Sequence, residues 1–113
     1  MGRIRYDIDE ITKIMKDYFK KIMNVKSVTY FYDANFNEDG WDFSTCHFEV
    51  VDTIELEVGN IKKTIDQKYY ISYEIFIDIL NDYFNKNNIS ISMIYPYKTA
   101  IVVDYKKDKT LIK

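Results

Sequence analysis

The strongest constraint on the fold is a long stretch of alternating apolar and polar residues in the middle of the chain. Every second residue along much of it is apolar: Phe48, Val50, Ile54, Leu56 and Val58. This period of two is typical of a half-buried strand. Residues 58–61 read Val-Gly-Asn-Ile, which predicts a two-residue hairpin turn. We therefore expect a hairpin that starts near Asp42, pairs Glu57 with Lys62, pairs Ile54 with Ile65 and has a bulge or a break near Asp52.

Two segments have helical periodicity instead. The first helix should begin near Asp7, which can cap it with Glu10 three residues on, and should end around Asn24. Its apolar positions are Ile8, Ile11, Met15, Tyr18 and Ile22. The second helix should begin near Ser72 and end at residues 87–88. Its apolar positions are Ile75, Phe76, Ile79, Leu80, Tyr83 and Phe84.

Short alternating runs predict further strands at 27–32, 89–93 and 99–105, with a turn at 95–98 that has Pro96 at its second position. The predicted order is α-β-β-β-α-β-β. The expected fold is α+β, an antiparallel sheet of five to six strands with both helices on one face. A length of 113 residues fits a single domain, of which 106–113 form a basic tail.

An internal repeat is a further hypothesis. Residues 14–21 read IMKDYFKK and residues 79–86 read ILNDYFNK, and at the same offset Tyr30 matches Tyr95 and Tyr32 matches Tyr97. An αββ duplication would relate the two helices by a pseudo-twofold axis. Chance similarity is the alternative, because few residue types dominate this sequence.

Composition bears on location and partners. Cys46 is the only cysteine in the sequence, which excludes an intramolecular disulfide and fits a reducing compartment. The sequence has no apolar run near the ~20 residues of a membrane-spanning helix and no signal peptide at its start. We therefore expect a cytoplasmic protein that does not associate with membranes. The 11 tyrosines and 7 phenylalanines fit both a core and a contact surface.

One string has the form of a catalytic motif. Residues 100–106, AIVVDYK, resemble the D-x-K half of the PD-(D/E)xK nuclease motif, which would imply a metal-dependent nuclease centred on Asp104 and Lys106. That family also needs a metal-binding acid on the preceding strand, and residues 85–103 contain no Asp or Glu. The favoured interpretation is a last strand that runs into a solvated tail.

Other metal or nucleophile sites are also disfavoured. Residues 33–40 resemble the start of an EF-hand calcium loop, but Glu38 stands where the turn glycine belongs and Ser44 where the bidentate glutamate belongs. Cys46 and His47 are neighbours on a predicted strand, so their side chains should point to opposite faces, Cys46 into the core. We predict no cofactor, no metal site and no catalytic residues.

The distribution of charge is more informative. Net charge is only −2, yet no Lys or Arg lies between Lys26 and Lys62 while acids accumulate there. We expect Glu49, Glu55 and Glu57 to share one strand face and to form an acidic surface beside Trp41 that binds a basic partner. The predicted partner-binding residues are Asp33, Glu38, Asp39, Trp41, Asp42, Glu49, Glu55 and Glu57. A merely solvated acidic face is the alternative.

The working hypothesis is a binding or inhibitor protein, not an enzyme, that blocks the basic or nucleic-acid-binding surface of another protein. In size and character the chain is similar to small phage and mobile-element inhibitors such as anti-CRISPR proteins; an immunity protein against a toxin nuclease fits equally. The rival hypothesis is direct nucleic-acid binding or a nuclease-related domain. Its predicted binding residues are Lys13, Lys16, Lys20, Lys21, Lys26, Lys106 and Lys107. The tyrosine-rich strands are also compatible with a homodimer.

Overall fold

The computed structural model describes residues 2–36 and 42–107, and its fold is α+β. The described elements, in chain order, are β1 (Gly2–Asp7), α1 (Ile8–Lys20), β2 (Val25–Phe36), β3 (Asp42–Val58), β4 (Ile61–Ile71), α2 (Tyr73–Asn85), β5 (Ile89–Pro96) and β6 (Ala100–Lys107). The predicted order is therefore correct except for β1, which precedes the first helix.

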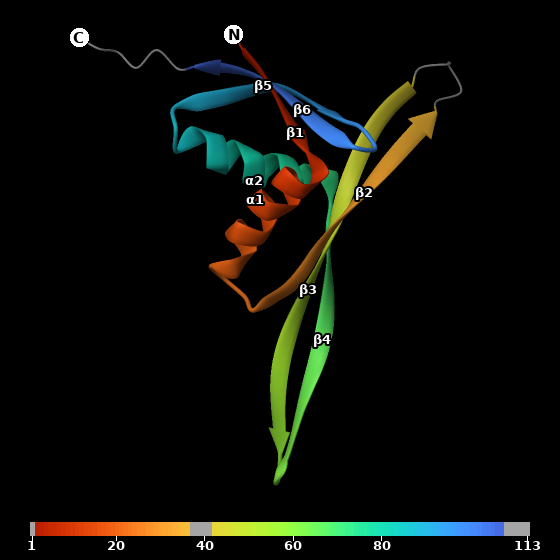
Figure 1. Ribbon diagram of the computed structural model, residues 1–113, viewed down its shortest axis with the longest axis vertical. Coiled ribbons are helices and arrows are strands. Elements are labelled where there is room, and N and C mark those ends of the chain that lie inside the picture. The colour runs from red at the N-terminus through yellow and green to blue at the C-terminus, as the bar shows by residue number, and fades with distance from the viewer. Residues whose placement is uncertain (1, 37–41, 108–113) are drawn as a thin grey trace, which may run out of the picture.

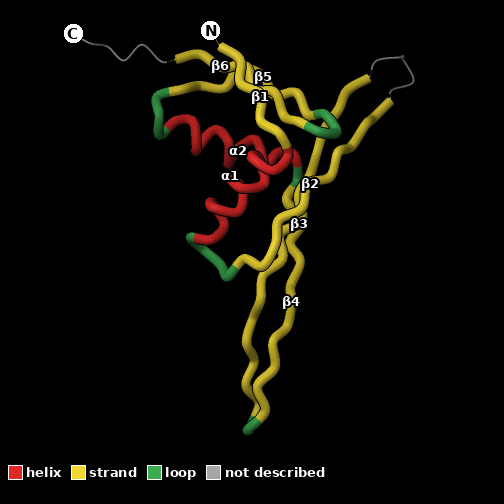
Figure 2. Tube along the Cα trace, viewed as in Figure 1, coloured by secondary structure: helices red, strands yellow, loops and turns green. Residues whose placement is uncertain are grey.

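The strands form two antiparallel three-stranded sheets, so the prediction of a single sheet is wrong. One sheet has the order β1-β6-β5 and the other the order β2-β3-β4. The helices lie in the angle between the two sheets (Figure 1). The second sheet is much longer than the first, and its β3–β4 end extends beyond the helices as a projecting ribbon (Figure 2). The molecule is accordingly elongated and flat, with extents of 60 × 49 × 20 Å.

The core lies between the helices and the inner faces of both sheets. Each sheet has one apolar face that must be covered, and the two helices cover the apolar faces of both sheets. The helices contribute Ile11, Met15, Phe19, Phe76, Ile79, Leu80 and Phe84, all buried. The strands contribute Cys46, Phe48, Val50, Ile71, Ile94, Ile101 and Val103. The predicted burial of Cys46 is confirmed.

Both helices start where the sequence predicts. Asp7 accepts a hydrogen bond from the Glu10 amide at 2.9 Å while the Glu10 carboxylate accepts one from the Asp7 amide at 3.0 Å, which completes a capping box. Ser72 caps α2 through the Ile75 amide. The helices end at Lys20 and Asn85, earlier than predicted, because the chain must turn there to enter β2 and β5. As a result Ile22, one of the apolar positions that the periodicity gave to this helix, lies beyond its end and is 67% exposed.

Two apolar positions of the second helix are not buried, and one turn differs from the prediction. Ile75 and Tyr83 are exposed on α2 because its buried stripe is narrower than the sequence periodicity indicates. The predicted turn at 95–98 is wrong, because β5 continues to Pro96. The turn lies between Tyr97 and Ala100, where the Tyr97 amide donates to the Ala100 carbonyl at 2.8 Å. A proline fits at the end of β5 because β5 is an edge strand.

The hairpin of β3 and β4 has the predicted register. Glu57 lies opposite Lys62, Ile54 lies opposite Ile65, and Gly59 in the turn has a φ of 64°. The sequence predicts a bulge or a break near Asp52; there is no break, since β3 runs through Asp52 as one strand, but the pairing with β2 is irregular there. The irregularity lies in the partner strand, where the register of β2 shifts directly beside Asp52.

The predicted αββ duplication is not confirmed, but the arrangement is compatible with it. The helices have equal length, and an offset of 65 residues carries Ile8 onto Tyr73. The same offset carries the buried Ile11, Met15 and Phe19 onto the buried Phe76, Leu80 and Phe84. Exchanging β1, β2 and β3 with β4, β5 and β6 turns the strand order of one sheet into that of the other. The repeated unit on this view is βαββ and includes the strand that the sequence prediction missed.

Candidate functional site

The outer part of the β3–β4 hairpin is the most exposed region that the structure describes. We call residues 53–70 the arm. Every residue from 55 to 70 is exposed. β2 pairs with β3 only as far as Asp52, so residues 53–66 lie beyond its end, and residues 67–70 belong to the edge strand β4. Two strands alone are marginally stable in water. The arm therefore contributes surface to the molecule and little to its core.

One face of the arm is apolar. This apolar face is the continuation of the core-facing side of the second sheet. Alternate residues of a strand point to the same side, so the residues in step with Phe48 and Val50 stay on the core-facing side along the whole of β3. Its aliphatic side chains are Leu56 (45% exposed), Val58 (75%), Ile61 (61%) and Ile65 (43%). With Lys63 they line a shallow hollow of about 210 Å³. In the sequence Leu56 and Val58 continue the alternation of the core residues Phe48 and Val50 on the same strand, so the pattern does not indicate that they are exposed.

The opposite face of the second sheet brings together four of the acids that were predicted to bind a partner. Asp33 on β2 and Glu49, Glu55 and Glu57 on β3 all fall on this outer face, according to the strand register. Asp42 begins β3. Glu38, Asp39 and Trp41 lie outside the described residues.

Lysines share that outer face, however. Lys62 lies opposite Glu57, and Lys68 Nζ is 3.9 Å from Glu49 Oε1. Lys26 Nζ is 2.7 Å from Asp66 Oδ2. The acids still outnumber the lysines there, but the face is a charge-paired surface with an acidic excess and not a continuous anionic ridge. Exposed pairs of this kind contribute little to stability.

An aromatic stack crosses the same outer face. His47 lies between Phe31 and Tyr70, with ring centroids 4.8 Å apart on each side. His47 Nδ1 lies 2.7 Å from Asp33 Oδ2. The predicted separation of Cys46 and His47 onto opposite faces is confirmed, and burial raises the pKa of the Cys46 thiol to about 12. Such a thiol is not a nucleophile at neutral pH.

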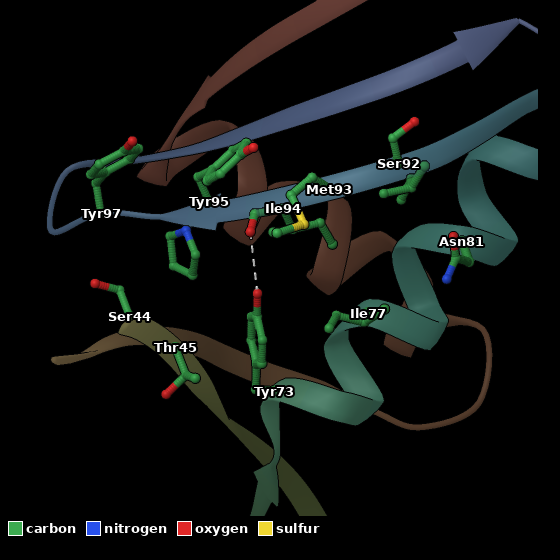
Figure 3. Close-up of a pocket in the computed structure, with 12 residues that line it drawn as sticks. Ser44, Thr45, Tyr73, Ile77, Asn81, Ser92, Met93, Ile94, Tyr95 and Tyr97 are labelled. Atoms are coloured by element: carbon green, nitrogen blue, oxygen red, sulfur yellow. Dashed lines mark hydrogen bonds between the residues drawn. The ribbon is translucent and has the colours of Figure 1, made fainter. Parts of the chain in front are cut away.

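A groove of about 630 Å³ runs between the edge strand β5, helix α2 and the start of β3 (Figure 3). It is lined by Ser44, Thr45, Tyr73, Ile77, Asn81, Ile91, Ser92, Met93, Ile94, Tyr95, Pro96 and Tyr97. None of these lining residues is charged. The Tyr73 hydroxyl donates across the groove to the Ile94 carbonyl at 3.4 Å. Pro96 in a strand-like run was the sequence signal that could have marked this edge.

The lysines of the rival hypothesis are divided among several places. Lys13, Lys16 and Lys26 line one groove of about 310 Å³ between α1 and β2, together with Asp9. Lys20 ends α1 and Lys21 caps it. Lys106 and Lys107 end β6 in the other sheet. The structure thus brings three of the seven together.

The D-x-K string does not form a metal centre with the described residues. The Asp104 carboxylate is held by the Arg3 guanidinium through two hydrogen bonds of 2.6 and 3.0 Å, which lowers the pKa of Asp104. Arg3 also lies over the Tyr95 ring. Within residues 2–36 and 42–107, no three His, Cys, Asp or Glu side chains lie close enough together to hold a metal ion.

Comparison with protein-family models, curated proteins and solved structures finds no match to this chain. Among the described helices, none has the length and apolar character needed to cross a membrane.

Proposed function

We propose that this chain is a binding or inhibitor protein that inserts its β3–β4 arm into a cleft of a protein partner. The observation that carries the proposal is the exposure of the whole segment 55–70, including four aliphatic side chains on one face. Exposed apolar surface on a projecting element is typical of an interaction site. A two-stranded ribbon is also narrow enough to enter a cleft.

The two faces of the arm set the chemistry of the partner. The apolar face around Val58 and Ile61 requires an apolar wall. The outer face continues the outer face of the second sheet, where Asp33 and Glu49 add to the acids of the arm and carboxylates outnumber lysines, and this favours a basic wall on the other side. A basic cleft that normally holds nucleic acid has this character, so occupying it would inhibit the partner. Inhibition of a defence nuclease and neutralisation of a toxin nuclease are both covered by this mechanism.

The proposal is tested by comparing what immobilised wild type and variants retain from cell lysate. Val58→Ser with Ile61→Ser removes the apolar contact at the tip. Glu49→Gln, Glu55→Gln and Glu57→Gln together remove the acidic excess. We expect the first variant to lose the partner through faster dissociation, and the second to associate more slowly and with less dependence on salt.

Matched controls come from exposed residues outside the arm. Ile22→Ser changes an aliphatic side chain that is 67% exposed beside α1. Glu74→Gln, Asp78→Asn and Asp82→Asn neutralise three exposed acids of α2. Both controls should retain the partner as well as wild type. If the arm variants and the controls bind the same protein equally, the arm is not the contact surface.

Nucleic-acid binding is the second candidate, favoured by the groove that Lys13, Lys16 and Lys26 line. It predicts binding of labelled single-stranded DNA or RNA that weakens steeply with salt and is lost in Lys13→Gln with Lys16→Gln. The arm proposal predicts no binding at low salt. The same titration therefore separates the two candidates.

A further inference from the structure

We propose a second binding site, distinct from the arm: the groove between β5 and α2 takes an extended, uncharged peptide segment of a partner protein, which adds as a strand to the free edge of β5. Three observations support it independently of the arm: the backbone geometry of the β5 edge, the uncharged lining, and the different lining of an equivalent groove elsewhere in the fold.

The edge of β5 presents backbone groups to the groove. β5 pairs with β6 on one side, and its other side has no strand partner among the described residues. The Tyr97 amide bonds to Ala100, so the alternation of an antiparallel ladder turns Tyr95 toward β6 and Ile94 and Pro96 outward. The bond from Tyr73 to the Ile94 carbonyl confirms this direction. An added strand would bond to the Ile94 amide and carbonyl and to the Pro96 carbonyl.

The groove has the size and the lining that such a segment needs. Its 630 Å³ lies within the range of ligand sites, roughly 300–1,000 Å³. Side chains of an added strand would alternate between Ile77 on α2 and the exposed Met93 on the opposite side. Because the lining has no charged residue, a charged side chain placed there would lose water without gaining a partner. The groove therefore selects uncharged segments.

The α1–β2 groove is the equivalent of the α2–β5 groove in the other half of the fold, and the linings of the two grooves differ in charge. An offset of 65 residues carries Thr12, Lys16 and Lys26 of the α1–β2 groove onto Ile77, Asn81 and Ile91 of the α2–β5 groove. It also carries Ser27 onto Ser92 and Val28 onto Met93. Both grooves lie between an edge strand and a helix. Of the three lysines in the α1–β2 groove, the two at shared positions correspond to neutral residues in the α2–β5 groove, so only the α2–β5 groove suits an uncharged peptide.

The test is titration of the isotopically labelled, full-length protein with three pools of short, acetylated and amidated peptides. The first pool contains only Ser, Thr, Val, Ile and Tyr. The second has Glu in place of Thr, and the third is the first pool with N-methylated backbone amides. We expect the first pool to shift the amide resonances of Ile94 and Asn81, and the other two to do so roughly tenfold more weakly, because they carry charge or lack backbone donors.

Variants make the test specific. Tyr73→Phe frees the Ile94 carbonyl and should tighten binding of the first pool roughly twofold to threefold, since the lost bond is long and weak. Asn81→Lys with Ile91→Lys installs the lysines of the equivalent groove and should reverse the preference toward the Glu pool. The control Lys16→Asn, in the α1–β2 groove, should change nothing at Ile94.

Three results would overturn the proposal. One is equal binding of all three pools, which would mean an unspecific apolar pocket. Another is no shift at Ile94 with any pool in both wild type and Tyr73→Phe. The third is a concentration-dependent shift at the same amides without peptide, which would mean that a second copy of this chain occupies the groove. Loss of partner capture by arm variants has no bearing on these outcomes, so the two proposals fail separately.

Discussion

Shortening the arm should leave the stability of the molecule nearly unchanged. Deleting residues 55–58 and 61–64 joins Ile54 to Ile65 through the existing Gly59-Asn60 turn. Because Ile54 and Ile65 are already a cross-strand pair, and four residues leave each strand, every remaining side chain keeps its face. The deletion removes the apolar tip that the proposed function requires.

The expected magnitude follows from exposure. Full burial of an aliphatic side chain contributes about 1.5–3 kcal/mol. Leu56, Val58 and Ile61 keep between 45% and 75% of their surface in water, so each contributes about 1 kcal/mol. Ordering each backbone residue costs about 1–2 kcal/mol, which the ladder hydrogen bonds and side-chain contacts roughly offset. We therefore expect the free energy of unfolding to change by no more than about 2 kcal/mol.

Urea denaturation of both proteins measures this change, with Phe76→Ala as the reference. Phe76 is fully buried, so its truncation should cost about 3–5 kcal/mol. A loss of that size on shortening the arm would refute the reasoning, because it would mean that the arm buries its apolar face in the native state. A dependence of the wild-type midpoint on protein concentration would then identify a second copy as the cover.

Three smaller predictions follow from single residues. Asp52 is buried and its Oδ1 has no hydrogen-bond partner among the described residues, so Asp52→Asn should raise the free energy of unfolding by about 1 kcal/mol in urea denaturation; no gain would contradict this. Gly59→Ala places a side chain at a φ of 64° and should speed amide exchange at Val58 and Ile61 while leaving the global midpoint unchanged. Burial raises the pKa of Cys46 from 9.0 to about 12, so the folded state favours the protonated thiol. The stability that this thiol contributes is complete below pH 9 and is lost as pH rises toward 12, and Cys46→Ala should flatten that part of the curve of unfolding free energy against pH.

Local chemistry made much of the fold predictable from the sequence. The capping box at Asp7, the cap at Ser72 and the turn at Gly59 each depend on residues within a few positions of one another. The alternation of β3 also fixed the hairpin register, because a shift of one residue would reverse both faces of the sheet. These features required no knowledge of distant contacts.

Features that depend on distant contacts were missed. β1 is too short to be recognised alone, and its partner β6 lies at the other end of the chain. The division into two sheets follows from that pairing. Glu49 pairs with Lys68, which lies on another strand, so the sequence alone did not identify this lysine as its partner. The exposure of Val58 depends on the end of β2 pairing, which no residue near Val58 signals.

The relation between the two halves of the fold leads to a last prediction, on chain connectivity. Because Gly2 pairs with Tyr105 at one end and the Gly59-Asn60 turn joins β3 to β4 at the other, β6 and β1 can be linked as β3 and β4 already are. A circular permutant that starts at Asn60, ends at Gly59 and joins Lys107 to Gly2 through a short Gly-Ser linker keeps every described strand pair. We expect it to fold with near-wild-type stability, since the new termini lie at the exposed tip of the arm. Failure to fold, in a variant that removes no core residue, would show that the hairpin connection of β3 and β4 organises folding. In that case the two halves are not interchangeable units.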